Sequence, residues 1–589
     1  MALRGLFGLI SLVVVIVAVT LNYRGSQQCR VIPGDQSWPS LEHWNDLNQT
    51  IHGKLIASVP LAAPCHYTSE GTSEGATTFN QDRCDALRDE WFFPTTHLGS
   101  PSSPMAYQFT NDSCNPFTDP DLPCTLGYHV AYTVNATEIE DFQAALQFVK
   151  RHNIRLVIRN TGHDYLGKST GAHALAVWTR HLKSLELIPK YHDSGYQGAA
   201  IKVGAGVEFL ELYQFASSNG LMVAGGNCPN VGPAGGYAQG GGIGILSSKF
   251  GLAADNVLSW EAVTAAGDHI TASATENTDL YWALRGGGGG TYAIVTSMTV
   301  KAYPDTTFST VYLSAFDDGS NTDAIYSVMG TFLQALPTLV DAGAWLVFVV
   351  APFGFLVMPA MVADLKASEL DAYFQSTREK MDQLGLQYQY QSADYPSFLQ
   401  SYQSMTSTWN VSDFNMGGRL IPRELAKDQE STDSLVKAIR AIATKTLTIG
   451  VAFNVAKGVS SPDEVAVNPY FRKTLFNAVI GTPINYTNFA SNKEAQDAIT
   501  NTFLPELEAI TPNGGVYMNE ADFQAPDFKT TFYGGNYKKL LAIKNKYDPD
   551  HIFYAKTAVG SDRWEQRIDG RLCSKGRAIW EQYIPGFLR

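Results

Sequence analysis

The sequence has few charged residues, and it lacks the patterns that mark several large classes of protein. Lys, Arg, Asp and Glu make up 17% of its 589 residues, whereas about 25% is typical of soluble domains. The formal net charge is −13, so the chain does not carry the basic face expected of a nucleic-acid-binding protein. No G-x-y period is present, which excludes a collagen-like chain. Aromatic residues at 12% and 51 glycines exclude disorder as the main state.

Two kinds of ligand-binding pattern are also missing. His163 and His173 have no carboxylate or cysteine partners at metal-ligand spacing, so no metal site is predicted. The dinucleotide fingerprint G-x-G-x-x-G is absent from the glycine-rich loops. A dinucleotide, if bound, must therefore be held in another way.

Long apolar runs are limited to two segments. Arg4 is followed by an apolar run from Leu6 to Leu21, the pattern of a secretory signal peptide. An uncleaved membrane anchor is the alternative, although a spanning helix needs about 20 apolar residues. Residues 1–24 are therefore predicted to be a signal peptide or an anchor. We expect a monomer that is secreted or in the lumen of the secretory pathway, with membrane contact only if this segment is uncleaved.

The second apolar run extends from Gly343 to Ala363 without a charged residue. It contains Pro352, Gly354 and Pro359, and its apolar pieces are short and rich in β-forming residues. This pattern predicts two buried strands with a Pro-Gly turn between them rather than a membrane span.

Seven cysteines are present, and in a secreted chain most of them should pair. Their spacing suggests three pairs, although sequence alone leaves other connectivities open: Cys65 with Cys84, Cys114 with Cys124, and Cys29 with Cys573. Cys228 is left over, and an odd cysteine in a secreted protein needs an explanation. Five Asn-x-Ser/Thr sequons fit a glycosylated secretory protein: Asn48, Asn111, Asn135, Asn410 and Asn485.

Composition divides the chain further. Residues 25–124 are rich in Ser, Thr, Pro and Asp and hold most of the cysteines, which predicts an irregular, disulfide-tied extension. Residues 125–304 mix short helices and strands, a pattern typical of an α+β domain. The glycine clusters vanish from 305 to 515, which predicts a second domain. Residues 516–589 form a last unit.

Several elements can be placed by their patterns. Thr137-x-x-Glu140 predicts a capping box at the start of a helix. Residues 260–272 predict a hairpin that turns at Gly267-Asp268, and residues 294–302 alternate as a strand. A helix through Leu540 and Tyr547 should end at Asp548-Pro549.

Three glycine-dense loops lie within residues 159–171, 225–244 and 285–290. Glycines at this density let the backbone approach a large anionic ligand and offer N–H groups to it. Flexible surface loops are the alternative, but each loop is flanked by a strand or helix pattern. We therefore predict a ligand site where the three loops meet.

The first of these loops also contains a full Walker A pattern, Gly162-x-x-x-x-Gly167-Lys168-Ser169. A nucleotide triphosphatase should also have a hydrophobic strand that ends in a magnesium-binding Asp. No convincing strand of this kind is found, so a P-loop nucleotidase is the less favoured alternative.

A set of motifs in this order is highly specific: Arg159-Asn-Thr-Gly-His163, Gly-Asn-Cys228-Pro-Asn-Val-Gly, Gly251-Leu-Ala-Ala-Asp-Asn256 and Asp279-Leu-Tyr-Trp-Ala-Leu-Arg-Gly286. They resemble the berberine-bridge-enzyme-like flavin oxidases of the vanillyl-alcohol-oxidase superfamily. Asn536-Tyr537 and Lys546-Tyr-Asp-Pro549 resemble the C-terminal signature of that family. The resemblance covers roughly residues 125–305 and 515–557. The N-terminal extension and Arg571-Leu-Cys573 resemble its fungal, isoamyl-alcohol-oxidase-like branch.

The resemblance implies a two-part FAD-binding domain of the PCMH type at 125–304, a mixed α/β substrate domain at 305–515 and a C-terminal segment, 516–589, that closes over the flavin. It implies FAD attached twice, with the 8α-methyl on His163 and C6 on Cys228, which would explain the odd cysteine. The alternatives are a polar-loop histidine and a buried free thiol. By motif, further FAD-contacting positions are Arg159, Asn160, Thr161, Gly162, Asp164, Val231, Gly232, Gly236, Gly242, Asn536 and Tyr537.

The proton acceptor is the point at which this chain departs from the family. Plant members often have Tyr-x-Asn-Tyr, with the last Tyr as base, whereas this chain reads Tyr517-Met-Asn-Glu520. Glu520 could serve as the base if burial raises its pKa, or it could be a surface residue in a salt bridge. Tyr517 and Asp522 are alternative bases. Val231 stands where, in relatives, a small branched residue lets dioxygen reach the flavin.

Together these features predict an FAD-dependent oxidase. It would pass a hydride from an alcohol carbon to flavin N5, giving an aldehyde or ketone and hydrogen peroxide, in fungal secondary-metabolite (polyketide or mycotoxin) biosynthesis. Its partners would be a small-molecule alcohol and dioxygen. The alternatives are a secreted oligosaccharide oxidase, oxidative cyclisation or coupling of a metabolite, and a non-catalytic flavin carrier. The apolar stretch from Trp345 to Met358 favours a metabolite over a sugar.

Overall fold

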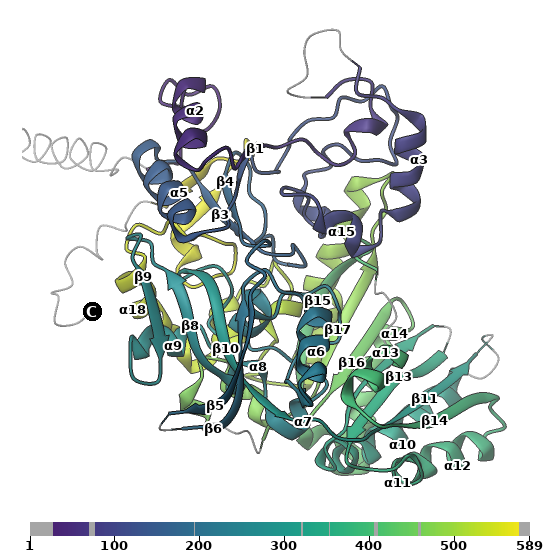
Figure 1. The fold of residues 1–589 in the computed structure, drawn as a ribbon. Coiled ribbons are helices and arrows are strands. Elements are labelled where there is room, and N and C mark those ends of the chain that lie inside the picture. Colours follow the sequence, from purple (N-terminus) through teal and green to yellow (C-terminus); the bar gives the residue numbers. More distant parts are fainter. Residues whose placement is uncertain are drawn as a thin grey trace, which may run out of the picture.

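A computed structural model describes residues 28–575 except 70–76, 194, 318, 320–321, 353, 406–409 and 457–460. The predicted signal segment, residues 1–24, lies outside the described residues. Two sheets are built from residues 55–304 and a third from residues 308–483. The third sheet lies to one side of the first two (Figure 1).

The first sheet has four strands in the order β1-β2-β4-β3: Leu55–Ala57, Tyr132–Asn135, Leu175–Trp178 and Leu156–Arg159. β2, β4 and β3 are parallel, and β1 from the N-terminal extension adds an antiparallel edge. The extension is therefore less irregular than predicted, because it contributes a strand and also helices α2 (Leu41–Thr50), α3 (Gln81–Glu90) and α4 (Pro94–Leu98).

Helix α5 (Ile139–His152) packs against this sheet together with α2. The predicted capping box at Thr137 and Glu140 is wrong by one residue. Glu138 is the N-cap, and the Asp141 carboxylate accepts hydrogen bonds from the backbone N–H groups of Thr137 and Glu138, at 2.9 and 3.2 Å. An acid three residues after the cap reaches these unpaired donors, as the capping-box geometry requires.

The second sheet is antiparallel, in the order β5-β6-β10-β8-β9, with a short strand β7 beside β10: Leu185–His192, Gln197–Gly204, Ile294–Pro304, Val257–Val263, His269–Ser273 and Leu221–Met222. The predicted hairpin is β8 and β9, and the predicted alternating strand is β10, so both predictions are confirmed. Helix α6 (Phe209–Ser218) buries Phe209, Leu212 and Tyr213 in the same core.

The third sheet has seven antiparallel strands in the order β14-β11-β13-β12-β16-β17-β15: Tyr388–Tyr395, Phe308–Phe316, Gly354–Ala363, Trp345–Ala351, Leu447–Ala452, Thr474–Pro483 and Phe414–Pro422. The uncharged run at 343–363 forms β12 and β13, as predicted. Within the described residues, no helix is both long enough and apolar enough to span a membrane.

The two faces of this sheet pack against different partners. Helices α10 (Thr322–Asp341), α11 (Ala367–Tyr373), α12 (Gln375–Gln383) and α14 (Gln429–Ala443) lie on its outer side (Figure 1). Phe348 and Val350 of β12 belong to the core under these helices, whereas Trp345 and Val347 belong to the core shared with the second sheet. Because side chains alternate along a strand, β12 separates the two cores.

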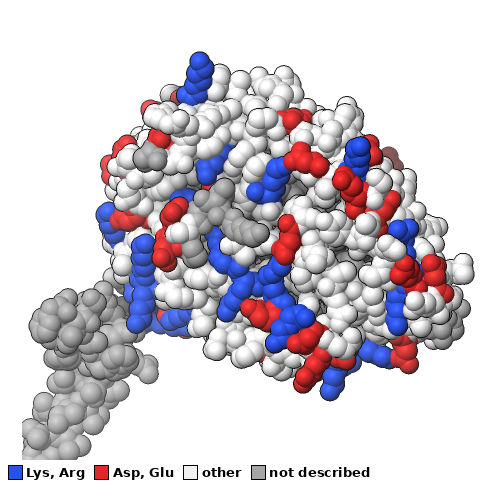
Figure 2. All heavy atoms as spheres, turned by 90° about the horizontal axis from the view of Figure 1, so that it is seen from below, with Lys and Arg blue, Asp and Glu red and all other residues white. Residues whose placement is uncertain are grey.

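Shorter elements complete the fold: α7 (Ser247–Phe250), α8 (Ala253–Asn256), α9 (Thr278–Ala283), α13 (Phe398–Met405), α15 (Phe489–Ala498), α16 (Leu504–Ile510), α17 (Phe528–Tyr533), α18 (Tyr537–Tyr547), β18 (Trp564–Gln566) and β19 (Leu572–Ser574). Helix α18 ends before Asp548-Pro549, as predicted. On the face shown in Figure 2, acidic and basic side chains are interspersed on a mostly uncharged surface.

The three predicted disulfides are all present, Cys65–Cys84, Cys114–Cys124 and Cys29–Cys573, and Cys228 is a free cysteine. The last bridge joins residues 544 positions apart. Among the sequons, Asn111, Asn410 and Asn485 are exposed, whereas Asn48 and Asn135 are half-buried.

A buried ion pair fastens α18 to the centre of the molecule. Lys544 and Asp548 have side chains only 1% and 0% exposed, and they lie 2.5 Å apart. The Lys544 ammonium also donates to the carbonyl oxygens of Thr291 and Phe553, at 2.5 and 2.7 Å. Asp548 accepts from the N–H groups of Ile552 and Phe553. Every charge in this pair is thus matched by hydrogen bonds.

Lys544→Met should lower the free energy of unfolding by about 3–5 kcal/mol, because it leaves the Asp548 carboxylate buried without its partner. The matched control is Lys546→Met on the same helix, whose pair with Asp279 is exposed and should cost about 0–1 kcal/mol. Guanidinium denaturation of both variants measures the difference. Equal losses in the two variants would contradict the structural role of the buried pair.

Candidate functional site

The three glycine-dense loops meet in direct contact, the second and third through their backbones and the first through the Asn160 side chain. A Cβ on Gly289 of the third loop would lie 2.5 Å from the Cα of Gly236 in the second loop. A Cβ on Gly232 or Gly235 would lie 2.7 or 3.0 Å from the side chain of Asn160, which belongs to the first loop. No larger residue fits at these positions without moving a loop. The predicted convergence of the three loops is confirmed.

Gln239 holds the second and third loops together. Its carbonyl oxygen accepts hydrogen bonds from the N–H groups of Gly286 and Gly288, at 3.1 and 2.9 Å. Its side chain donates to the Ala234 carbonyl and accepts from the N–H of Gly290. Gln239 is not part of any motif noted in the sequence, so its bridging role was missed.

The first loop places Arg159 in a buried position and His163 in a half-buried one. Among the described residues, His163 Nε2 is a buried atom with no hydrogen-bond partner, and burial lowers the pKa of His163 to about 4. Arg159 is 0% exposed, and its guanidinium lies where a Cβ on Gly162 would reach it at 2.7 Å. It donates to the His97 carbonyl at 3.3 Å, while its Nε and Nη1 have no partner in the described chain.

The neighbouring positions are also enclosed. Thr161 is 4% exposed. Asn160 donates to the Ala205 carbonyl at 2.5 Å, and its Oδ1 has no partner among the described residues. Since buried polar atoms are normally paired, the unpaired atoms of this loop indicate that a ligand belongs here.

Cys228 lies in the second loop, half-buried and unpaired. Burial raises the pKa of its thiol, the N–H groups of Asn230 and Val231 oppose that shift, and the Glu208 carboxylate adds to it. Val231 also accepts a hydrogen bond from the N–H of Phe209 through its carbonyl, at 3.1 Å. Cys228 is therefore outside the structural disulfides, in a partly enclosed position.

The Walker A pattern does not form a phosphate-binding loop. The Asp164 carboxylate accepts from the backbone N–H of Lys168, and those of Leu166 and Ser169 also point to it. These are the donors that a phosphate would need. In addition, residues 160–174 contain no helix after β3, whereas a P-loop opens one. The structure therefore does not support the nucleotidase alternative. The Asp164 side chain instead holds the loop together through hydrogen bonds to its N–H groups.

Glu520 lies in a 3-10 turn, Met518–Glu520. Its Oε2 accepts a hydrogen bond of 2.6 Å from the Asn477 amide on β17. Burial raises the pKa of Glu520 to about 7, and the Asn477 amide opposes that shift. No charged side chain of the described chain contributes to it, so Glu520 is not the salt-bridged surface residue that was the alternative.

The other two candidate bases have different surroundings. The Tyr517 hydroxyl receives hydrogen bonds from the Asn519 amide at 2.9 Å and from the N–H groups of Gly242 and Ile243, and burial raises its pKa. The Asp522 carboxylate accepts from Gln496, Thr500 and the N–H of Gln524, at 2.7–2.9 Å. Both groups hold the local chain in place.

Gly418 explains how Glu520 reaches the sheet. A Cβ at Gly418 of β15 would lie 2.3 Å from the Glu520 carbonyl oxygen, so only glycine lets the turn lie this close to the strand. Next to it, the N–H of Leu420 donates to the Gly515 carbonyl at 2.9 Å. The segment that carries Glu520 thus runs along the edge strand of the third sheet.

Tyr165 feels the charges of groups from both halves of the site, and it was not among the predicted site residues. Burial raises its pKa, and the negative charges of Cys228, Asp413 and Glu520 add to that shift. The Tyr165 hydroxyl is therefore within electrostatic range of all three groups. Its position two residues after His163, in the most specific motif, was the signal that could have identified it.

Asn536 and Tyr537 make hydrogen bonds that hold the C-terminal segment in place. The Asn536 amide donates to the carbonyls of Ala466 and Val467, at 3.3 and 3.0 Å, and Val467 packs against Gly286 of the third loop. The Tyr537 hydroxyl donates to Asp562 at 3.0 Å and accepts from the N–H of Gly560. Asn536 therefore links the C-terminal segment to residues that pack on the third loop, whereas the bonds of Tyr537 stay within the C-terminal segment.

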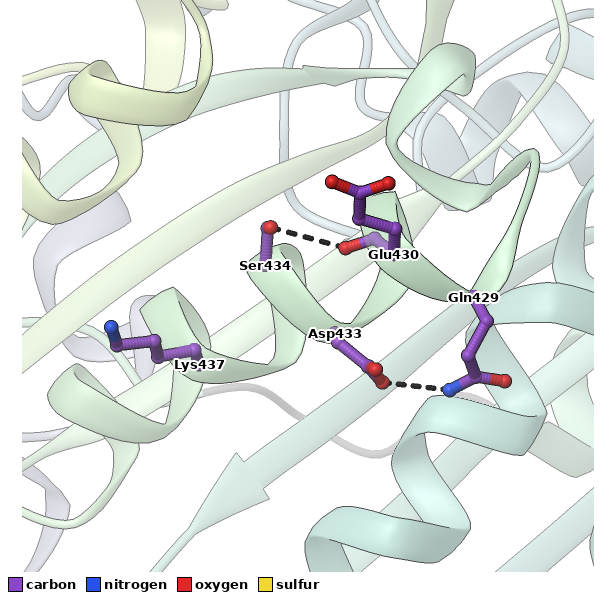
Figure 3. A pocket seen from close by; sticks show the side chains of 5 residues that line it. All are labelled: Gln429, Glu430, Asp433, Ser434 and Lys437. Carbon is purple, nitrogen blue, oxygen red and sulfur yellow. Dashed lines mark hydrogen bonds between the residues drawn. The ribbon is translucent and has the colours of Figure 1, made fainter.

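A hollow of about 500 Å³ elsewhere on the surface is not this site. It is lined by Gln429, Glu430, Asp433, Ser434 and Lys437, all from the outer face of α14 (Figure 3). Side chains of a single exposed helix do not converge on a ligand as those of an active site do. Within the described ranges, no group of three His, Cys, Asp or Glu is arranged to hold a metal ion.

Comparison with known proteins covers nearly the whole chain. A family model described as "FAD binding domain" matches residues 130–273, and one described as "Berberine and berberine like" matches residues 516–560. The FAD-linked oxidoreductase sor8 of Hypocrea jecorina is 41% identical over 559 residues, which are 94% of this chain and 95% of that protein. The chain belongs to the berberine-bridge-enzyme-like FAD-linked oxidoreductases.

Two further similarities extend over the same length. The bifunctional decalin synthase calF of Penicillium decumbens is 40% identical over 576 residues, 96% of this chain and 99% of that protein. The crystal structure of VAO-type flavoprotein MtVAO615 from Myceliophthora thermophila C1 has a TM-score of 0.88 at 37% identity and covers 93% of this chain and 100% of that one. These findings confirm the predicted PCMH-type α+β fold.

More distant structures share the fold only. Glucooligosaccharide oxidase from Acremonium strictum, described with a 6-S-cysteinyl, 8α-N1-histidyl FAD, has a TM-score of 0.58 at 18% identity and covers 74% of this chain and 92% of that one.

The residues of the loops fit FAD as the cofactor of this oxidoreductase. The unpaired atoms of His163, Arg159 and Asn160 are buried and polar, as a large ligand with many acceptor and donor groups requires. The glycine contacts leave the backbone of Gly236 open, with nothing within 4 Å of a Cβ placed there. The first and second loops would hold the cofactor, and the third supports them.

Proposed function

We propose that this enzyme is an oxidase that converts an alcohol to an aldehyde or ketone, with dioxygen reduced to hydrogen peroxide. When bound, FAD supplies the two-electron acceptor for the hydride of the alcohol C–H bond and passes both electrons to dioxygen. Glu520 takes the hydroxyl proton, so that one alcohol and one dioxygen give one carbonyl compound and one hydrogen peroxide.

The observation that carries the proposal is the environment of Glu520. A carboxyl group whose pKa is about 7 accepts a proton readily near neutral pH, which is the property a general base needs. The Asn477 amide fixes its orientation. Tyr517 and Asp522, the alternative bases, are already engaged in hydrogen bonds that hold the chain.

Two covalent links to FAD are part of the proposal. His163 offers a buried ring nitrogen without a partner in the described chain, and Cys228 offers a thiol outside the three disulfides. Attachment at both residues satisfies the unpaired nitrogen and accounts for the seventh cysteine. Val231, three residues after Cys228, would leave room for dioxygen at the flavin.

Oxidative cyclisation of a metabolite is the second candidate function. It is favoured by the similarity to a bifunctional decalin synthase over 96% of the chain, and the same flavin chemistry would start it. A role in fungal secondary metabolism accommodates both candidates. The three disulfides support passage through the secretory pathway, because disulfides persist in oxidising compartments.

Glu520→Gln should lower kcat/KM for alcohol oxidation by about 10²–10⁴-fold, because it removes the proton acceptor while keeping the shape. Tyr517→Phe and Asp522→Asn serve as matched comparisons, and we expect them to affect stability more than rate. Peroxide release measures the rate, and flavin absorbance confirms equal cofactor loading. A larger rate loss in either comparison variant would show that the residue changed in that variant, and not Glu520, is the general base.

The rate should also report the titration of Glu520. We expect kcat/KM to rise with pH through a midpoint near 7, because only the ionised carboxylate accepts a proton. Asn477→Leu removes the amide that stabilises the ionised form, so the midpoint should move to higher pH by on the order of one pH unit. Asn415→Leu is the control, since that buried amide bonds to Thr482 instead. A midpoint unchanged by Asn477→Leu would argue against Glu520.

Flavin attachment can be tested without substrate. After acid denaturation the yellow colour should stay with the polypeptide, and mass spectrometry should find flavin on peptides that contain His163 and Cys228. Cys228→Ser should retain a flavin linked through His163 alone. Flavin released freely by acid would contradict both links.

A further inference from the structure

A row of directly paired residues, one from each strand, crosses the third sheet and begins beneath Glu520. Gly418, which the Glu520 turn covers, pairs with Val479, and each residue pairs with the next across the sheet. The row is Gly418, Val479, Ile449, Val349, Leu356, Ser314 and Gln389. Directly paired residues of antiparallel strands project from the same face. The row therefore leads from the candidate base across all seven strands.

The row projects from the face opposite the covering helices. The residues next to it along the strands, Ala478, Phe348 and Phe355, belong to the core under α10 and α14. Because neighbours on a strand point to opposite faces, Val479, Val349 and Leu356 point away from those helices. Asn477, which bonds to Glu520, shares their face, since it lies two residues from Val479.

The middle of this row is aliphatic. Val349, Ala351 and Leu356 form a small apolar cluster, on which Met358, Leu447 and Ile449 pack. Ile449 also packs against the large core shared with the second sheet. Within the described chain, the apolar side chains packed on this cluster all come from the sheet itself. We call these six residues the aliphatic strip. Met358, Leu447 and Ile449 are half-buried, so the strip is partly open.

The strip has a polar group at each end. Glu520 and Asn477 lie at the β15 and β17 end, and Ser314 and Gln389 continue the row at the other end. From Gly418 to Leu356 the row crosses four interstrand spacings of about 4.8 Å, or roughly 19 Å. At the first end, Glu520 already engages the amide of Asn477.

We propose that the aliphatic strip is the substrate-specificity surface, and that it takes a hydroxylated metabolite with an extended aliphatic portion. The hydroxyl group lies at Glu520 and the aliphatic portion lies across β17, β16, β12 and β13. Val349 and Ile449, at the centre of the strip, determine specificity. This inference rests on the proposed function. A sugar would also present hydroxyl groups to the aliphatic side chains between the two polar ends, where they find no hydrogen-bond partners, which costs binding free energy.

The test uses the holoenzyme and the linear alcohols from 1-propanol to 1-octanol, with cellobiose as the sugar. Peroxide release gives kcat/KM for each. We expect kcat/KM to rise about fourfold with each added methylene, which corresponds to about 0.8 kcal/mol of transfer free energy. In the double variant Val349→Thr with Ile449→Thr, the rise should fall below about twofold. Thr448→Val, a swap of equal volume on the opposite face of β16, should keep the fourfold rise.

A binding measurement separates this inference from the oxidase proposal. The amides from propanamide to octanamide carry no oxidisable alcohol, and their binding is followed by the change in flavin absorbance. The dissociation constant should fall about fourfold per methylene in the parent enzyme and in Thr448→Val, and less steeply in the double variant.

The outcomes are distinct. Peroxide formed at a rate independent of chain length, or preferentially from cellobiose, overturns the strip proposal and leaves the oxidase proposal standing. No peroxide from any alcohol, together with amide binding that tightens with chain length and weakens in the double variant, supports the strip and overturns the oxidase proposal. Amide affinity independent of chain length, or unchanged in the double variant, overturns the strip.

Discussion

The contact between the backbones of Gly236 and Gly289 is the constraint on which the rest of the site depends. Two loops far apart in the sequence approach so closely that one added carbon atom would lie 2.5 Å from the opposing Cα. Asn160 continues the stack against Gly232 and Gly235. Because interiors are packed as densely as crystals, a displacement in one loop passes to the next. The stack thus ties together the two loops that carry His163 and Cys228.

The features that could be predicted from the sequence depend on local or compositional signals. Glycine density located the three loops, cysteine spacing located the disulfides, and periodicity located β8, β9, β10, β12 and β13. The environment of Glu520 could not be predicted, because Asn477 lies 43 residues away and the gap at Gly418 exists only once β15 is in place. The two faces of β12 were equally hidden, since every residue from Trp345 to Ala351 is apolar and buried.

The Walker A pattern shows why a motif needs its surroundings. The spacing of glycines, lysine and serine is complete, yet Asp164 supplies the negative charge that the loop N–H groups would otherwise seek in a ligand. The Asp164 carboxylate takes the place that a phosphate would fill between Gly162 and Gly167. In this chain the carboxylate of Asp164 therefore takes the donors on which phosphate binding would depend.

The bridge between Cys29 and Cys573 has a consequence for the topology of the molecule. It closes residues 29–573 into a single covalent ring, and the bridged residues lie 3.9 Å apart at Cα. A single cut in any surface loop within that ring opens it without releasing a fragment. A circularly permuted chain, with its new termini in a distant loop, would therefore contain the same residue contacts.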